Sequence, residues 1–160
     1  MRYLEESKTN NLPRMITIQN AYSLLNRVFE GDMAEISLRE NIGLLAYSPM
    51  AFGVLSGKYV QGTASDNSRL KLFPRFSRYS SKKSTEATKK YLKIAQEHNL
   101  SLAQMALAFV SQQPFVTSNI IGATSLKQLK ENIESIHLSL NKDILNSIEE
   151  IHAEIPNPAP

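Results

Sequence analysis

The chain has 160 residues, and 42% of them are hydrophobic, which is enough for one globular domain with its own core. Lys and Arg outnumber Asp and Glu by 18 to 15, and the resulting net charge of +3 permits an anionic ligand without requiring nucleic acid. The chain has no cysteine, which excludes disulfides and thiolate metal sites. It also has neither an apolar stretch of roughly 18 residues nor a signal-peptide pattern, so a cytoplasmic protein without a membrane span is expected.

The first residues, MRYLEESKTNNLPR, are typical of the second half of an amphipathic helix, with Tyr3 and Leu4 facing inward. Three short apolar segments after them are typical of parallel strands covered on both faces, namely residues 15–19, 43–47 and 119–121. Strands that alternate with helices indicate an α/β fold with parallel pairing. Three strands form an incomplete sheet whose open edges need a partner, so the chain is expected to be part of a larger unit.

Apolar residues at helical spacing predict helices between and after these strands. They cover residues 23–29, 32–40, 82–98 and 102–113, and two more begin at Ser125 and Asn141. In residues 82–98 the inward positions are Ala87, Tyr91, Ile94 and Ala95.

Capping residues mark several of these helix starts. Ser101 with Gln104, and Ser125 with Gln128, have the spacing of a capping box, in which the two side chains bond reciprocally to the first turn. Asn141 is expected to cap the last helix. The tail IPNPAP cannot continue that helix and is expected on the surface.

The helix that begins at Ser125 carries two different faces. One has the spacing of a buried apolar stripe and consists of Leu126, Leu129, Ile133 and Ile136. The other is polar and consists of Gln128, Glu131 and Asn132. The polar face is either simply solvated or contacts a ligand.

Residues 60–81 lack a clean period and are long for a connection, which is typical of a functional lid or a disordered loop. Residues 71–83 interleave basic and aromatic side chains, a pattern that also occurs in single-stranded nucleic-acid binders. One such tract in a weakly basic chain favours aromatic residues that dock on the domain instead, and no nucleic-acid partner is predicted.

Ligands of α/β folds gather at the carboxyl ends of parallel strands. Here that rule selects Gln19, the segment 47–50 and the segment 122–124. Free N–H groups of residues 124–127, together with the helix dipole, predict an anion site at the last of these.

Other common motifs are excluded by their spacing. Residues 53–59, GVLSGKY, have three residues between the glycines and a tyrosine after the lysine, so they are not a phosphate loop of the Walker type. The chain has neither a GxGxxG nor a GxSxG sequence. His98, His137 and His152 have no partner at metal-ligand spacing, so no metal site is predicted.

Taken together, AYSPMAFGVLSGKY, then NSR, then IIGATSLKQLKENI closely resemble the aldo-keto reductase superfamily. The nearest resemblance is to bacterial NADP(H)-dependent members and to the potassium-channel β-subunit branch, and it covers essentially the whole chain. It implies an eight-stranded (β/α) barrel that binds NADPH at the carboxyl ends of its strands. The expected fold is therefore a partial (β/α)8 TIM barrel, comprising about the last three βα units.

The resemblance also assigns cofactor-binding residues. Gln19 would bind the nicotinamide amide, and Tyr47 would stack on the nicotinamide ring. The turn along the pyrophosphate would consist of Ser48, Pro49, Met50, Ala51 and Phe52. Lys58 would bind phosphate, while Ser68 and Arg69 would clamp the cofactor and make residues 60–81 its covering loop. The adenosine end would be held by Gly122, Thr124, Gln128, Glu131 and Asn132.

The catalytic Tyr, Asp, Lys and His of the family lie on early strands, and no position of this chain matches them. No catalytic residue is therefore assigned, and Tyr22, Tyr59 and Asp32 do not take that role. The expected function is reduction of an aldehyde or ketone with NADP(H), because a bidentate guanidinium beside the 2′-phosphate favours NADP(H) over NAD(H). That activity would need the missing half, as a separate chain or in the intact gene product. The alternative is a non-catalytic fragment that binds a nucleotide or a partner, akin to a channel β-subunit.

Overall fold

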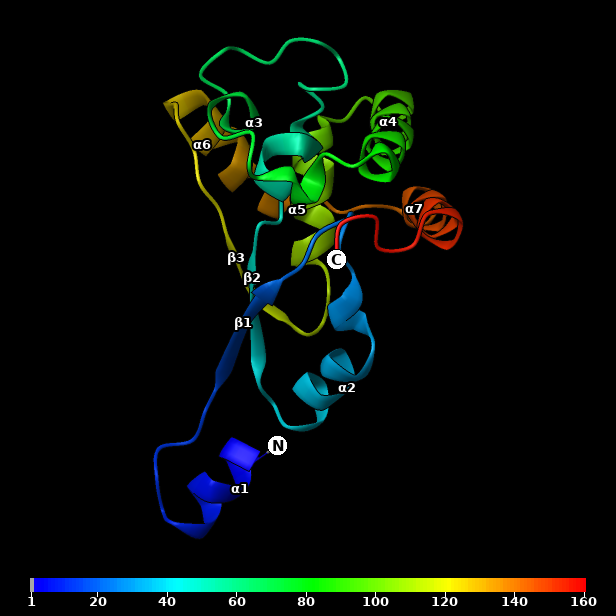
Figure 1. The fold of residues 1–160 in the computed structure, drawn as a ribbon. Coiled ribbons are helices and arrows are strands. Elements are labelled where there is room, and N and C mark those ends of the chain that lie inside the picture. Colours follow the sequence, from blue (N-terminus) through cyan, green and yellow to red (C-terminus); the bar gives the residue numbers. More distant parts are fainter. Residues whose placement is uncertain (1) are drawn as a thin grey trace.

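A three-stranded parallel sheet forms the centre of the computed structural model, which describes residues 2–160 (Figure 1). Strands β1 (Thr17–Ala21), β2 (Gly43–Tyr47) and β3 (Val116–Ile120) lie in the order β1-β2-β3, so all three point to the same edge. The predicted parallel pairing is confirmed. The central strand has its predicted bounds, β1 lies two residues later than expected, and β3 starts three residues earlier.

Helices surround this sheet in a mixed α/β arrangement. The α-helices are α1 (Arg2–Thr9), α2 (Asp32–Arg39), α3 (Arg69–Leu72), α4 (Lys82–Glu97), α5 (Leu102–Ser111), α6 (Leu126–Glu134) and α7 (Lys142–Glu154). Short 3₁₀ helices are η1 (Val28–Glu30), η2 (Ala51–Ser56), η3 (Ser77–Tyr79) and η4 (Ser135–His137). No helix in residues 2–160 is long and apolar enough to cross a lipid bilayer.

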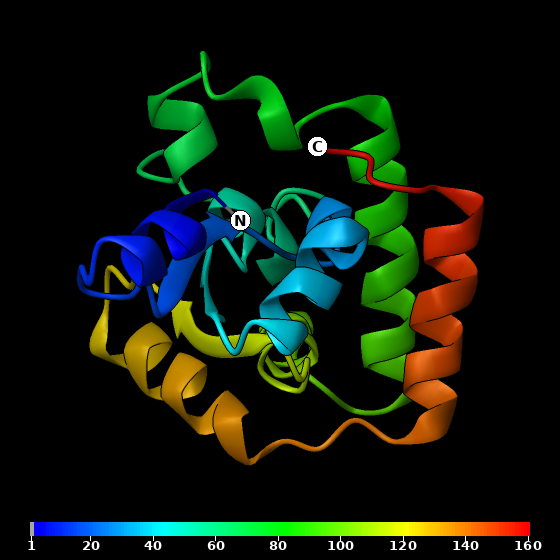
Figure 2. The same cartoon turned by 90° about the horizontal axis from the view of Figure 1, so that it is seen from below.

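The core lies around α5, which is buried over most of its length because it packs between β3 and α4. α7 covers the outer side of α4 (Figure 2). The predicted inward face of α4 is confirmed, since Ala87, Tyr91, Ile94 and Ala95 are all buried. The Asn141 cap is also confirmed, because its Oδ1 accepts a hydrogen bond from the Ile144 N–H at 3.0 Å.

Three predictions near the termini and after β1 are wrong. Residues 23–29 are not an α-helix, because the Ser23 and Asn26 side chains accept bonds from nearby backbone N–H groups and hold a buried turn before η1. In α1, Leu4 is buried as expected, but Tyr3 is 79% exposed. The tail does not lie free on the surface: Ala159 is 1% exposed, and its N–H donates to the Leu25 carbonyl.

The apolar stripe of α6 is the largest departure from prediction. Leu126, Leu129, Ile133 and Ile136 are exposed by 85%, 39%, 55% and 63%, and α6 contains no buried residue. α6 contacts α5 through its polar side, and η4 continues it along the chain (Figure 2). The spacing correctly predicted an apolar face, but nothing in the described chain covers it.

Candidate cofactor site

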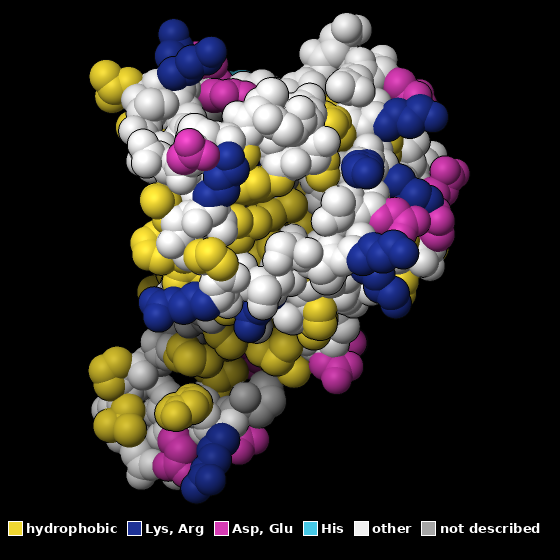
Figure 3. Space-filling model, turned by 45° about the horizontal axis from the view of Figure 1, so that its top comes forward, with side chains coloured by type: hydrophobic (Ala, Val, Ile, Leu, Met, Phe, Trp, Pro, Cys, Tyr) yellow, Lys and Arg dark blue, Asp and Glu magenta, His cyan; other side chains and the backbone are white. Residues whose placement is uncertain are grey.

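The carboxyl edge of the sheet brings the predicted cofactor residues to one end of the molecule (Figure 1). Tyr47 is the last residue of β2 and is paired with Ala21 of β1 and Ile120 of β3. Gln19 lies two residues before the end of β1 and is exposed. Figure 3, with this edge turned toward the viewer, shows exposed apolar side chains, with both basic and acidic side chains nearby.

The turn after Tyr47 has an unusual backbone. Ser48, Ala51 and Phe52 have positive φ values of 55°, 47° and 56°, which are costly for residues other than glycine. The turn is held by its own bonds, because the Ala51 N–H donates to the Ser48 carbonyl and the Gly53 N–H to the Met50 carbonyl, both at 2.8 Å. Pro49 and Ala51 are buried beneath it. Such strain is typical of backbone that is shaped for a ligand.

Two predicted cations lie against this turn. The Lys58 Nζ lies 5.2 Å from the centroid of the Tyr59 ring. The same Nζ lies close to Gly53 in the turn, since a Cβ added at Gly53 would be 3.3 Å from it. The Arg69 guanidinium lies 5.3 Å from the centroid of the Phe52 ring. Neither cation takes part in any ion pair among residues 2–160.

Ser68 adds a polar group to the same place. It is 5% exposed and precedes α3, yet its Oγ neither caps that helix nor finds another hydrogen-bond partner in residues 2–160. The Tyr59 hydroxyl accepts a bond from the Leu70 N–H at 3.2 Å, which ties α3 to the segment that carries Lys58. The structure thus brings together the turn, Lys58, Ser68 and Arg69, although they are far apart in sequence.

Arg78 is a residue of this site that the sequence did not single out. Interaction with the hydroxyl of Tyr79, and then with that of Tyr47, raises the pKa of Arg78 above its usual range. Tyr79 is buried and packs edge-on against Phe52, with ring centroids 5.0 Å apart. The predicted docking of aromatic residues from 71–83 is confirmed for Phe76 and Tyr79, which pack on Phe52, but not for Phe73, which is 45% exposed. The alternation of basic and aromatic residues there was the available signal for Arg78.

Ser125 caps α6 as predicted, but the Gln128 side chain bonds to Thr124 and not to the Ser125 N–H that a capping box requires. The Ser125 Oγ accepts a bond from the Gln128 N–H at 3.3 Å. The Gln128 Oε1 accepts bonds from both the N–H and the hydroxyl of Thr124, each at 3.0 Å. The expectation that the Thr124 N–H is free is therefore wrong. Gly122, Thr124 and Gln128 are all exposed.

The remaining polar residues of α6 face α5. The Glu131 Oε1 accepts a bond from the Ser101 hydroxyl at 2.6 Å, and the Glu131 carbonyl accepts one from the Gln104 Nε2 at 3.2 Å. The predicted capping box at Ser101 is therefore wrong, because both of its side chains bind Glu131 instead. Asn132 is half-buried beside them.

The two groups of predicted residues lie at one edge of the sheet but on separate segments. The turn, Lys58 and Arg69 belong to η2, α3 and their connection, whereas the residues at 122–132 belong to α6 and the segment before it (Figure 2). Two shallow hollows are found elsewhere, one along α4 and one over the apolar stripe of α6. In residues 2–160, no three His, Cys, Asp or Glu side chains are placed to hold a metal ion.

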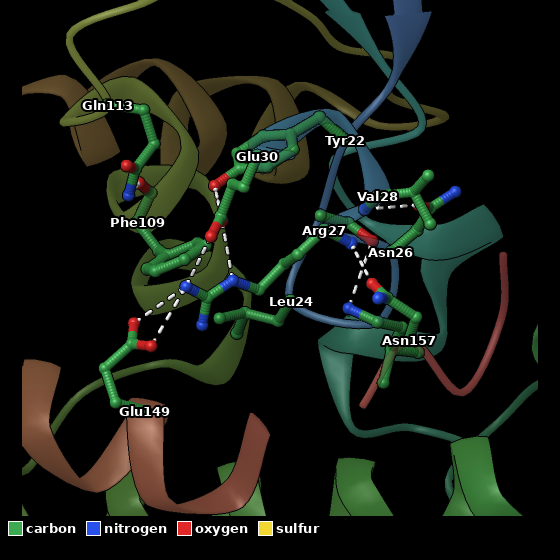
Figure 4. Close-up of polar contacts among 12 residues, drawn as sticks. Tyr22, Leu24, Asn26, Arg27, Val28, Glu30, Phe109, Gln113, Glu149 and Asn157 are labelled. Carbon is green, nitrogen blue, oxygen red and sulfur yellow. Dashed lines mark hydrogen bonds and ion pairs between the residues drawn. The ribbon is translucent and has the colours of Figure 1, made fainter. Parts of the chain in front are cut away.

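A separate buried cluster surrounds Arg27 (Figure 4). The Arg27 Nε donates to Glu30 at 2.6 Å and its Nη2 to Glu149 at 3.0 Å, while the guanidinium lies 5.1 Å from the centroid of the Phe109 ring. The Tyr22 hydroxyl donates to Glu30, and burial raises the pKa of Tyr22 far above its usual range. Tyr22 therefore stays protonated, which agrees with a structural role.

Comparison with known proteins places the chain in a family. The model of the Aldo/keto reductase family matches residues 1–153, and the chain belongs to this family. It is 52% identical over 160 residues to Protein tas of Escherichia coli (strain K12), covering 100% of this chain and 46% of that protein. It is 33% identical over 124 residues to L-glyceraldehyde 3-phosphate reductase of the same organism, covering 74% of the chain and 36% of the relative.

The chain is also similar to a plant protein. The chain is 31% identical over 143 residues to a probable voltage-gated potassium channel subunit beta of Oryza sativa subsp. japonica, covering 85% of the chain and 43% of the relative. The chain thus spans less than half the length of each of these three proteins.

Proposed function

We propose that this chain is the cofactor-binding, C-terminal portion of an NADP(H)-dependent aldo-keto reductase that reduces aldehydes or ketones. Its three βα units would form part of a (β/α)8 barrel, with residues 60–81 covering the cofactor. The observation that carries the proposal is the strained turn after Tyr47, with Lys58 and Arg69 against it and no carboxylate of residues 2–160 paired to either cation. A phosphorylated ligand would supply the missing negative charge.

The residues present fit NADP(H). Ser68 offers a buried hydroxyl without a partner, next to the exposed guanidinium of Arg69. In this proposal Lys58 and Arg69 hold phosphates, and Tyr47 orients the nicotinamide, to whose amide Gln19 bonds. The bound cofactor would supply hydride. The N–H groups at the start of α6 and its polar face would hold the adenosine end.

The carbonyl-reducing activity requires residues that this chain does not supply. We propose that the apolar stripe of α6, together with the outer edges of β1 and β3, is covered by the remaining βα units of the barrel, in the same polypeptide or as a separate chain. Ile16 beside β1 and Ile120 in β3 are 69% and 42% exposed, as expected for surfaces that the remaining βα units would cover. The general acid for the carbonyl would come from those units.

Titration of the purified chain with NADPH tests the cofactor assignment. NADPH fluorescence should change saturably, and Arg69→Gln should weaken binding by about 10- to 100-fold, because a charged hydrogen bond contributes about 1.5–3 kcal/mol. Arg39→Gln is the matched control, since Arg39 is an exposed arginine on α2 paired with Glu35. Equal binding by both variants would refute the assignment.

A non-catalytic, partner-binding role is the second candidate, and the uncovered apolar stripe of α6 favours it. The two functions differ once the remaining barrel units are joined to this chain. NADPH oxidation with 4-nitrobenzaldehyde by the joined protein would support the reductase. Cofactor binding without turnover would support the second candidate.

A further inference from the structure

The last residues of the chain, 155–160, are bonded to the loop that follows β1. The Asn157 Oδ1 accepts a hydrogen bond from the Arg27 N–H at 2.7 Å (Figure 4). The Ala159 N–H donates to the Leu25 carbonyl at 3.1 Å. Asn157 has a φ of 44°, a left-handed conformation that asparagine tolerates better than most residues. Since Ala159 is also buried, these bonds hold the tail in one place.

The same tail is bonded to the start of α4, where the predicted covering loop, residues 60–81, ends (Figure 2). The Pro158 carbonyl accepts hydrogen bonds from the hydroxyls of Ser81 at 3.3 Å and Ser84 at 3.1 Å. Ser81 is also the N-cap of α4, because its Oγ accepts a bond from the Ser84 N–H at 3.0 Å. The tail therefore links the last residue of the covering loop to the loop after β1.

The two ends of the covering loop are held differently. Near its beginning, residues 61–67 are exposed apart from the half-buried Ala64. Gly62 has a φ of 72°, and apart from its two chain neighbours no atom of residues 2–160 lies within 4 Å of a Cβ added there. Near the other end, Tyr79 is 1% exposed and packs on Phe52, with ring centroids 5.0 Å apart. The loop is thus fixed near Tyr79 and free of packing near Gly62.

We infer that the tail anchors the covering loop at Ser81, so that the loop opens from its Gly62 end and the anchor slows release of the cofactor. The nature of the ligand rests on the proposed function, whereas the anchoring does not. A loop with one end fixed loses less conformational entropy when it closes, which favours the closed state. Opening of a covering loop often limits ligand release. Asn157 would then be a positioning residue that contacts neither cofactor nor substrate.

Trypsin cleavage of the folded chain tests the anchor without any cofactor. Cleavage after Arg78, three residues before Ser81, should be slow relative to cleavage after the exposed Arg69. Asn157→Gly keeps the left-handed backbone accessible but removes the acceptor for the Arg27 N–H. It should raise the relative rate after Arg78 by about 2- to 10-fold, the effect of losing one hydrogen bond on the population of the open state. Asn157→Asp keeps an acceptor and should restore the slow rate.

Ile94→Ala is the control for a general loss of stability, because Ile94 is buried in α4 and is not part of the tail. It should speed cleavage at both sites and leave their ratio unchanged. If Asn157→Gly leaves the ratio unchanged, or if Asn157→Asp does not restore it, the inference is wrong.

Stopped-flow release of NADPH then tests the link to the cofactor. NADPH should dissociate from Asn157→Gly about 2- to 10-fold faster than from the unchanged chain, and Asn157→Asp should restore the slower rate. If cleavage responds to Asn157 but the dissociation rate of NADPH does not, the tail does not control release and the inference is wrong while the proposed function stands. If NADPH binds to neither protein, the proposed function fails, and the cleavage ratio alone decides whether the tail anchors the loop.

Discussion

The side of the molecule built from α4, α5 and α7 and the side that carries α6 are stabilised in different ways (Figure 2). On the first side, apolar residues of three helices cover one another, and the Arg27 cluster links the loop after β1 to α7. On the second side, α6 turns a polar face to α5 and an apolar face to solvent. We infer that the side built from α4, α5 and α7 supplies the stability of the chain, whereas the exposed apolar face of α6 is suited to contact another segment or protein.

Removal of the buried guanidinium should have the largest effect on the first side. Arg27→Leu would leave Glu30 and Glu149 without their cationic partner, and loss of one member of a buried pair costs about 3–5 kcal/mol. The free energy of unfolding from urea titration measures this cost. Arg39→Leu is the control, because its pair with Glu35 is exposed and should contribute less than about 1 kcal/mol. Equal losses would mean that the Arg27 cluster is solvated.

A pair of isoleucines tests the two helices directly. Ile94 of α4 is 6% exposed, so Ile94→Ala should cost about 2–4 kcal/mol from lost burial and the cavity left behind. Ile133 of α6 is 55% exposed, and Ile133→Ala should change stability by less than about 0.5 kcal/mol. Urea titration of both variants gives the comparison. A large loss for Ile133→Ala would show that the α6 stripe is already covered in solution.

The same two helices show what could be predicted from the sequence. The bounds of β2, α4 and the cap of α7 depend on local signals, namely hydrophobic period and a capping side chain, and they were predicted correctly. The apolar stripe of α6 has an equally clear period. The hydrophobic period of a helix shows which of its faces is apolar. It does not show which segment covers that face, because that segment can lie anywhere in the chain or outside it.

The other wrong predictions also arise from contacts between residues that are far apart in the sequence. The tail docks because the Arg27 N–H donates to the Asn157 Oδ1 at 2.7 Å, and no local pattern predicts that pairing. In the candidate site, motifs indicated the turn after Tyr47, Lys58 and Arg69, whose roles remain predictions. Arg78 was not singled out because the alternation of basic and aromatic residues marks residues 71–83 as a whole and does not distinguish Arg78 from Arg75.

The pH dependence of stability should give the smallest effect and should again belong to the first side. His152 of α7 has a buried Nδ1 without a hydrogen-bond partner in residues 2–160, and burial and the nearby Arg27 lower its pKa from the usual 6.5. Below pH 6.5 the unfolded chain takes up a proton that the folded chain resists, so the stability that His152 provides at higher pH is lost as pH falls toward its folded-state pKa.

His152→Gln should therefore flatten the dependence of the midpoint of thermal unfolding on pH between about 7.5 and 5.5. At most about one proton is involved, so the slope should change modestly while the midpoint at pH 7.5 changes little. Carboxylates that titrate in this range affect both proteins equally and cancel in the comparison. If both proteins lose stability in parallel on acidification, His152 is accessible to protons in the folded state. In that case α7 is packed less tightly against the Arg27 cluster than α4 is against α5.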